Sequence, residues 1–345
     1  MYFATHKTCN LSCRYCYIPK DNRQEKKADD SAIINALIKF IDKAESEGYA
    51  IGKFCFHGSE PSLMEPVTLT ECTKLVNRHW KKNKIEGLSV AIQTNGIRLN
   101  NDYLNVLEEK LNNKNDLRIG FSIDPPKQVH DLLRNDSYDI VFGNMNNTIN
   151  RGFKVGILSV ITNETIQYVR EFADWMKYYS WLSDNKGNPY KIKIKFATGE
   201  QALNENEIKE FSYYLKSNGL MNLCQILTPG YCMQRGNECE WYEFDIEGNC
   251  YSCNKAYGED GIFANWQNET FAEIVDKRKN LYITYLQNPE CCECIYELIC
   301  NSGCPIDRKK DGELAGKALE CSLIKIVLSE SEKNGNYIYE IINNC

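Results

Sequence analysis

Strand-like and helix-like segments alternate through the first two thirds of this 345-residue chain. The strand-like segments are short and apolar, as in LSVAIQT at 88–94, and the helix-like segments carry apolar residues at helical spacing, as at 30–47. Six such steps predict a parallel sheet with helices outside it, and they are too few for a closed eight-step barrel. The predicted strands are 2–8, 53–57, 88–94, 117–123, 155–161 and 190–196, and the predicted helices are 30–47, 67–82, 102–111, 138–151, 165–178 and 204–216.

An unusual short sequence follows each of the first five predicted strands. These sequences are 8–17, 57–61, 93–96, 122–124 and 162–163. Because parallel barrels bind ligands at the carboxyl ends of their strands, we expect these segments to form one site. The four histidines do not cluster in the sequence, and we expect them to have structural roles.

The segment after the first strand holds three cysteines at C-x3-C-x2-C spacing, Cys9, Cys13 and Cys16. A 4Fe–4S cluster normally takes four thiolates, so three would leave one iron open for a ligand that is not protein. The alternative is a zinc site, which would need a fourth protein ligand and more often shows paired C-x2-C units.

The remaining cysteines are concentrated near the C-terminus, where residues 224–345 hold 12 of the 17. The chain begins without a secretory signal and holds no apolar run long enough to span a membrane, so we expect a cytoplasmic protein. Disulfides are rare in that compartment, which indicates metal or redox chemistry for these thiols. The net charge of −6 argues against a nucleic-acid partner.

The cysteine spacing, with Tyr15 just before the third cysteine, resembles the cluster motif of the radical S-adenosylmethionine (SAM) superfamily. The resemblance implies an α/β fold, a partial (β/α)6 TIM-like barrel, with a 4Fe–4S cluster whose open iron binds the amino and carboxylate groups of SAM. Gly58-Ser59-Glu60-Pro61 resembles the family's Gly-Gly-Glu-Pro motif, which binds the SAM amino group, with serine in place of the second glycine.

Other segments at the predicted strand ends match the family's cofactor contacts. Thr94 and Asn95 resemble the polar segment beside the ribose and sulfonium, and Tyr15 would stack on the adenine. Arg134 matches a position that holds the SAM carboxylate, a role suited to the two-pronged donor geometry of arginine. The predicted cofactor contacts beyond the Gly-Ser-Glu-Pro segment are therefore Tyr15, Tyr17, Thr94, Asn95, Ser122 and Arg134.

The C-terminal third resembles the SPASM domain of the same superfamily, because the cysteines between 291 and 304 match its signature without a gap. The resemblance implies a barrel domain over 1–217 and a SPASM domain over 218–345. It also implies two auxiliary 4Fe–4S clusters, three in all with the SAM-binding cluster. The ligands that it assigns are Cys232, Cys239, Cys253 and Cys304 for auxiliary cluster I, and Cys291, Cys294, Cys300 and Cys321 for auxiliary cluster II.

Cys250 leaves the first of these ligand sets open, because Cys250-x2-Cys253 could also chelate. Residues 241–246 alternate like a strand, 247–249 form a turn, and the returning chain would bring Cys239 near Cys253. A residue three places away on a strand points to the opposite face, which favours Cys253 without Cys250. Two zinc knuckles are the alternative for the whole region.

These features predict a radical SAM/SPASM oxidoreductase that modifies a ribosomally made peptide or protein by forming a thioether or carbon–carbon crosslink. The partners that the resemblance implies are this peptide or protein substrate and a reductant of flavodoxin or ferredoxin type. Only eight residues precede Cys9, which leaves no room for an N-terminal leader-binding domain, so leader recognition would use the enzyme's own surfaces or a separate protein. The sequence identifies no catalytic acid or base.

Three other functions remain open. An anaerobic sulfatase maturase, which makes formylglycine, shares this architecture, but it carries an aspartate base where this chain has Asn254. A peptide epimerase or a small-molecule dehydrogenase would use the same SAM site. A ferredoxin-like electron carrier is the non-enzyme alternative, and the SAM-binding motifs at the strand ends argue against it.

Overall fold

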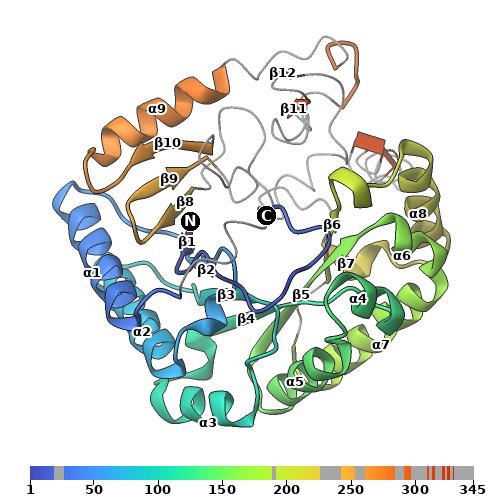
Figure 1. The fold of residues 1–345 in the computed structure, drawn as a ribbon, viewed down its shortest axis with the longest axis horizontal. Helices are drawn as coiled ribbons and strands as arrows, with labels where there is room; N and C mark the ends of the chain where they lie inside the picture. Colours follow the sequence, from blue (N-terminus) through green and yellow to red (C-terminus); the bar gives the residue numbers. More distant parts are fainter. Residues whose placement is uncertain are drawn as a thin grey trace.

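The computed structural model of the protein describes residues 1–18, 27–188, 192–225, 242–252, 261–283 and 291–296, together with 309–310, 313–314, 321–322, 325–326 and 329. Most of its strands form one sheet in the order β10-β9-β8-β1-β2-β3-β4-β5-β6-β7. The strands curve around a common centre and the helices lie outside them (Figure 1). The predicted α/β partial barrel is therefore confirmed.

Six parallel strands and the helices between them make up the barrel. The strands are β1 (Tyr2–Ala4), β2 (Cys55–His57), β3 (Val90–Thr94), β4 (Leu117–Ser122), β5 (Lys154–Ile161) and β6 (Ile192–Phe196). The helices are α1 (Asp30–Ser46), α2 (Pro66–Lys82), α3 (Asn101–Lys110), α4 (Lys127–Leu133), α5 (Tyr138–Asn150), α6 (Asn163–Gln167), α7 (Val169–Asn185) and α8 (Glu205–Ser217). Short 3₁₀ turns occupy Pro61–Leu63, Lys114–Asp116, Gly199–Gln201 and Met221–Leu223.

The two faces of the curved sheet differ in polarity, because successive residues of a strand point to opposite faces. The outer face is apolar: Phe56 and Ile119, for example, are buried in the core shared with the helices. The inner face carries polar side chains, among them His57, Gln93 and Lys193, at the alternate positions of β2, β3 and β6. We call the space enclosed by this inner face the lumen.

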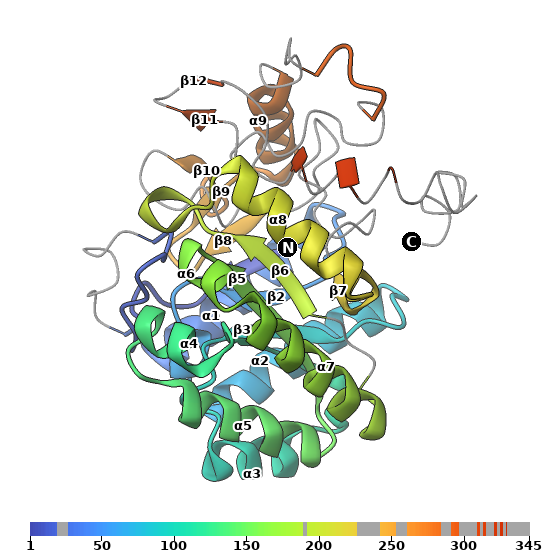
Figure 2. The same ribbon diagram turned by 90° about the vertical axis from the view of Figure 1, so that its right-hand side faces the viewer.

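Strands from the C-terminal third extend the same sheet. These elements are β7 (Cys224–Gln225), β8 (Glu243–Asp245), β9 (Asn249–Tyr251), β10 (Ile262–Asn265) and α9 (Phe271–Ile283), with a separate pair β11 (Lys309–Lys310) and β12 (Glu313–Leu314). The predicted hairpin is β8 and β9, which pair antiparallel, and β8 also pairs parallel with β1. The sheet thus continues across the predicted domain boundary at 217. Figure 2 shows α9, β11 and β12 at one end of the molecule and α3 and α5 at the other.

Local sequence explains two departures from the predicted elements. The predicted helix 165–178 is two helices, α6 and α7, which meet at Tyr168, where φ is −123° and ψ is 31°. Thr162 caps α6 through a reciprocal bond with Thr165, so the first helix begins before the predicted start. Helix α4 was not predicted, because its seven residues are too short to show a helical period.

No helix in the described ranges is long and apolar enough to cross a membrane.

Candidate active site

The three cysteines that follow β1 lie on one loop, residues 9–16, which we call the cysteine loop. Each of Cys9, Cys13 and Cys16 is half-buried, and the Cys16 backbone N–H donates to the Cys13 carbonyl at 3.2 Å. Burial raises the pKa of Cys9 to about 12, and the nearby charges of Glu60, Cys13 and Cys16 act in the same direction. The three thiols therefore share one environment at the carboxyl end of β1.

A donor set of three cysteine thiols suits a 4Fe–4S cluster, because each thiolate binds a different iron atom and the fourth iron stays open for another ligand.

Asn95, at the end of β3, fastens the cysteine loop to the barrel. Its Nδ2 donates to Asn10 Oδ1 at 2.7 Å and approaches Cys9 Sγ at 3.8 Å. On the other side of the loop, the Arg14 backbone N–H donates to the Leu133 carbonyl at 3.0 Å, at the end of α4. The loop is thus held between the end of β3 and the end of α4 by contacts within the protein.

Glu60 joins the segment after β2 to the end of β3. Its carboxylate is buried and accepts hydrogen bonds from the Ser62 N–H at 2.9 Å, the Thr94 Oγ1 at 2.6 Å and the Asn95 N–H at 2.7 Å. Burial raises the pKa of Glu60, while these bonds oppose that shift. Because both carboxylate oxygens are used within the protein, the backbone of this segment is the part that can meet a ligand, as predicted for Glu60 and Pro61. The bracing role of the Glu60 side chain was not predicted.

Gly58 and Ser59 give this segment an unusual backbone. Their φ angles are 81° and 43°, both in the left-handed region that glycine adopts most readily. A Cβ atom on Gly58 would lie 2.8 Å from the Ala4 Cβ and 3.2 Å from Glu243 Oε1, so only glycine fits. Ser59 holds its conformation at a cost of about 1 kcal/mol, which is why the family's pattern has glycine at this position.

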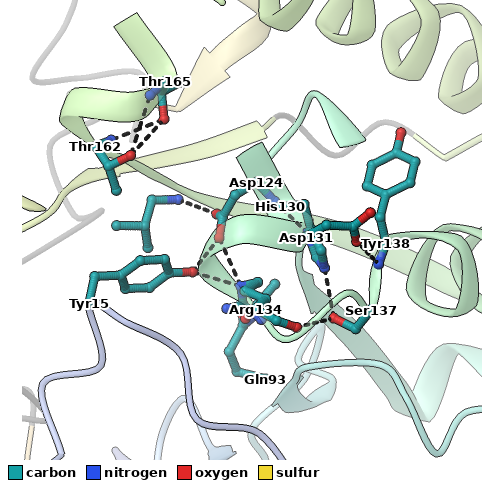
Figure 3. Close-up of polar contacts among 12 residues, drawn as sticks. Tyr15, Gln93, Asp124, His130, Asp131, Arg134, Ser137, Tyr138, Thr162 and Thr165 are labelled. Atoms are coloured by element: carbon teal, nitrogen blue, oxygen red, sulfur yellow. Dashed lines mark hydrogen bonds and ion pairs between the residues drawn. The ribbon is translucent and has the colours of Figure 1, made fainter. Parts of the chain in front are cut away.

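Arg134, Asp124 and Tyr15 form a buried polar group at the end of β4 (Figure 3). Arg134 Nε donates to Asp124 Oδ2 at 2.8 Å and contacts the Tyr15 hydroxyl at 2.7 Å, and that hydroxyl also donates to Asp124 Oδ2. Asp124 Oδ1 accepts the Val160 backbone N–H at 2.7 Å, and its own N–H donates to His130 Nδ1 at 3.2 Å.

One nitrogen of the Arg134 guanidinium group has no hydrogen-bond partner among the described residues. Arg134 is only 6% exposed, and its Nη1 is buried with no hydrogen-bond partner in the part of the chain that the structure describes. A buried guanidinium nitrogen of this kind favours a ligand carboxylate, because charge-assisted bonds to arginine are strong. The geometry therefore fits the predicted contact between Arg134 and the carboxylate of SAM. Its anchors, Asp124 and His130, were not predicted.

The remaining predicted contacts are Ser122, Tyr17 and the ring of Tyr15. Ser122 Oγ accepts from Gln93 Nε2 at 2.9 Å, so both lie on the lumen side of adjacent strands. Tyr17 is 38% exposed and its hydroxyl is 3.5 Å from His57 Nδ1. Tyr15 has its hydroxyl engaged by the group above, so only the face of its ring could meet an adenine.

The family model described as the radical SAM superfamily matches residues 4–176, half of the chain. The chain belongs to the radical SAM superfamily. Membership implies a 4Fe–4S cluster that binds SAM, and the three thiols of the cysteine loop supply the donor set for it.

Related radical SAM enzymes match over most of the chain. A cysteine-type anaerobic sulfatase-maturating enzyme of Clostridium perfringens is 25% identical over 343 residues, which cover 89% of this chain and 89% of the relative. A serine-type anaerobic sulfatase-maturating enzyme of Bacteroides thetaiotaomicron is 23% identical over 349 residues, covering 88% and 82%.

Two solved radical SAM structures share the fold. Native anSMEcpe with bound AdoMet and the Kp18Cys peptide has a TM-score of 0.72 and 17% identity, with 100% of each chain covered. Streptococcus suis SuiB bound to its precursor peptide SuiA has a TM-score of 0.62 and 12% identity, covering 92% of this chain and 74% of that one. The two structures confirm the architecture.

Most of the predicted auxiliary ligands lie outside the described residues. These ligands are Cys232, Cys239, Cys253, Cys300 and Cys304. In the described part, the Cys294 N–H donates to the Cys291 carbonyl at 2.9 Å, so these two begin one turn. Cys321 is half-buried. Cys250 is wholly buried in the apolar core, and its exclusion from the cluster ligands stays a prediction.

Glu243 of β8 is a buried carboxyl group that the sequence analysis did not single out. It is 0% exposed. Because neighbouring residues of a strand point to opposite faces, Glu243 points away from the face on which Phe244 packs into the core. Parallel pairing of β8 with β1 places Glu243 beside Tyr2, inside this radical SAM barrel. The sequence offered one signal, an acidic residue two places before Asp245 in an otherwise aromatic strand.

Proposed function

We propose that this radical SAM enzyme oxidatively modifies a side chain of a peptide or protein. The observation that carries the proposal is the joining of the cysteine loop, through Asn95 and Tyr15, to the strand ends that hold Glu60 and Arg134. With this arrangement, the predicted SAM site would lie at the mouth of a lumen with polar walls. The full-length relationship to sulfatase-maturating enzymes, which act on proteins, supports a peptide or protein as the substrate.

The chain's own residues would hold the cofactors as follows. The cysteine loop would bind the cluster, the backbone around Gly58 and Glu60 the SAM amino group, and Arg134 with Ser122 the SAM carboxylate. Thr94 and Asn95 would lie beside the ribose. When bound, the cluster and SAM supply a 5′-deoxyadenosyl radical, which takes a hydrogen atom from the substrate.

An oxidative crosslink, either a thioether or a carbon–carbon bond, is the first candidate for the product. One feature supports it: Asn254 stands where the resemblance places the aspartate of sulfatase maturases. The fold is also similar to that of SuiB, which binds a precursor peptide. The two auxiliary clusters assigned above would accept the electron that such an oxidation releases, and a flavodoxin or ferredoxin would reduce the SAM-binding cluster. Asn254 itself lies outside the described residues.

Formylglycine formation is the second candidate, and the curated relatives favour it. Both are named as anaerobic sulfatase-maturating enzymes, and the match extends over more than four fifths of each chain. The same SAM site and lumen would serve this reaction, provided that a residue other than Asn254 takes up the proton.

Mass spectrometry of the product separates the candidates. Anaerobically reconstituted protein is incubated with dithionite, SAM and two synthetic substrates, the Kp18Cys peptide and the SuiA precursor peptide. Loss of two hydrogen atoms without an aldehyde indicates a crosslink, whereas a hydrazide-reactive aldehyde on the Kp18Cys peptide indicates formylglycine. Deuterium uptake from the solvent without a change in composition would instead indicate epimerisation and contradict an oxidation.

A further inference from the structure

Glu243 is a buried carboxyl group that has no role in the predicted cofactor site. Both of its oxygens are buried without a hydrogen-bond partner among the described residues, although nearly all buried polar groups in proteins are paired. Such a group is costly to keep, and a residue that serves folding alone would be apolar at this position. The cost indicates a ligand that is present only during the reaction.

The position of Glu243 links it to the SAM site. Its Oε1 lies 3.2 Å from the point where a Cβ on Gly58 would stand, and Gly58 begins the segment predicted to bind the SAM amino group. Register pairs Glu243 with Tyr2, and Tyr2 with Cys55, so the three side chains stand at one level of the lumen. The carboxyl group therefore lies next to the cofactor segment, on the lumen side of the sheet.

The groups around Glu243 leave its carboxyl unpaired. On its own strand, Asp245 is occupied in the β8–β9 turn, where it accepts from the backbone and side chain of Asn249 and from the Tyr251 hydroxyl. On β2, burial raises the pKa of the Cys55 thiol to about 12. The charge of Lys193 on β6 lowers this pKa, and the charge of Glu243 raises it.

The protonation of Glu243 is poised close to neutrality. Burial, reinforced by the negative charge of Asp245, raises the pKa of Glu243 from 4.5 to about 8. His57, at the next level of the lumen, is held neutral, because burial lowers its pKa to about 3, with Lys193 acting in the same direction. A general base works best when its pKa is near the operating pH, and in this part of the lumen Glu243 is the group that meets this condition.

We propose that Glu243 is a catalytic residue, the acceptor of the proton that the substrate releases during oxidation in the lumen. This inference rests on the proposed function. After a hydrogen atom has left the substrate carbon, the radical loses one proton and one electron as the new bond forms. The proton passes from the substrate S–H, O–H or N–H to a Glu243 oxygen, and the electron passes to an iron–sulfur acceptor. The carboxylate becomes a carboxylic acid, and the product is closed-shell.

The first test needs no substrate. Infrared difference spectra of the anaerobically reconstituted protein, recorded from pH 5 to 10, should show the carbonyl band of a protonated carboxylic acid. This band should disappear with a midpoint near 8 and be missing from Glu243→Gln. A Glu243-dependent band that persists to pH 10 would overturn the proposal, because a carboxyl group that stays protonated cannot accept a proton.

The second test uses reconstituted enzyme with SAM and the Kp18Cys peptide. Product formation by Glu243→Gln should fall about 100-fold or more, the usual contribution of a general base. The ratio of 5′-deoxyadenosine to product should rise, because substrate radicals form but are not resolved. Glu243→Asp, which keeps a carboxyl group, should recover part of the product. Cys55→Ser, a change at the same level of the lumen, should keep the wild-type ratio.

The outcomes separate the inference from the proposed function. Wild-type turnover with an equal ratio in Glu243→Gln would overturn the role of Glu243 and leave the proposed function intact. A tenfold or greater loss of SAM affinity in Glu243→Gln would make Glu243 a cofactor ligand and also overturn it. If wild-type protein does not convert the Kp18Cys peptide, the infrared titration decides alone.

Discussion

Replacement of Arg134 tests how the barrel holds SAM. Its buried Nη1 has no partner among the described residues, while its Nε is committed to Asp124 and Tyr15. A charge-assisted bond from Nη1 to the SAM carboxylate contributes about 1.5–3 kcal/mol. Arg134→Lys should therefore weaken SAM binding about 10- to 100-fold. Lysine keeps a positive charge beside Asp124, so the fold should tolerate the change better than it tolerates Arg134→Ala.

Arg134→Ala has a second consequence that the structure makes calculable. Asp124 is 1% exposed, and removal of its cationic partner leaves a buried charge uncompensated. Breaking a buried ion pair in this way costs about 3–5 kcal/mol of stability. The alanine variant should therefore lose both SAM affinity and thermal stability, whereas the lysine variant should lose mainly affinity.

Isothermal titration of SAM into anaerobically reconstituted protein measures the effect, with iron content checked in each sample. Arg151→Ala is the matched control: Arg151 also pairs with a carboxylate, Glu108 at 2.7 Å, but it caps the C-terminal end of α5, just before the start of β5. Its SAM dissociation constant should equal that of wild type. An unchanged constant in Arg134→Lys and in folded Arg134→Ala would refute the reasoning and move the carboxylate contact to another residue.

Three further predictions follow from the same structure. Reconstituted wild-type protein should carry about twelve iron atoms, and replacing all three cysteines of the cysteine loop by alanine should remove about a third of them by iron assay; stoichiometric zinc with little iron would contradict this. Because the folded-state pKa of Glu243 is about 8 and its ordinary value is 4.5, the folded protein keeps a proton that the unfolded chain loses. The stability of Glu243→Gln relative to wild type, measured by thermal inactivation, should therefore grow from about pH 4.5 to 8 and level off above it; a difference independent of pH would show an ionised carboxyl. Thr94→Val removes the 2.6 Å bond to buried Glu60 and should cost about 1–3 kcal/mol in denaturation, with Thr70→Val on the outer helix costing less.

Helices and strands with a regular pattern of apolar residues could be predicted from the sequence. The pairing of strands that lie far apart in the chain could not. Strand β5 and helix α2 were predicted to within one residue at each end, because each carries a strong apolar pattern. The β8–β9 hairpin was also predicted, from its alternation and turn. Its parallel pairing with β1 was not, because no local pattern encodes which strand a hairpin joins.

The candidate site divides in the same way. Positions such as Asn95 and Arg134 could be named from the sequence, because the resemblance to the family's motifs assigns them. Their supports could not: Asp124 serves the site by accepting bonds from Arg134 and from the backbone of Val160, contacts that exist only in the folded barrel. Glu243 is the extreme case, since its burial and lack of partners are properties of the lumen rather than of its neighbours in sequence.

The formation of 5′-deoxyadenosine tests the central claim most directly. Reconstituted protein is reduced with dithionite, given SAM, and analysed by chromatography beside the variant in which the cysteine loop carries three alanines. Wild-type protein should produce 5′-deoxyadenosine and methionine in equal amounts, and the variant should produce neither while keeping its remaining iron. A wild-type protein that binds iron and SAM but releases no 5′-deoxyadenosine, or a variant that still releases it, would contradict the claim that the cysteine loop and the strand ends around it form the radical-generating centre.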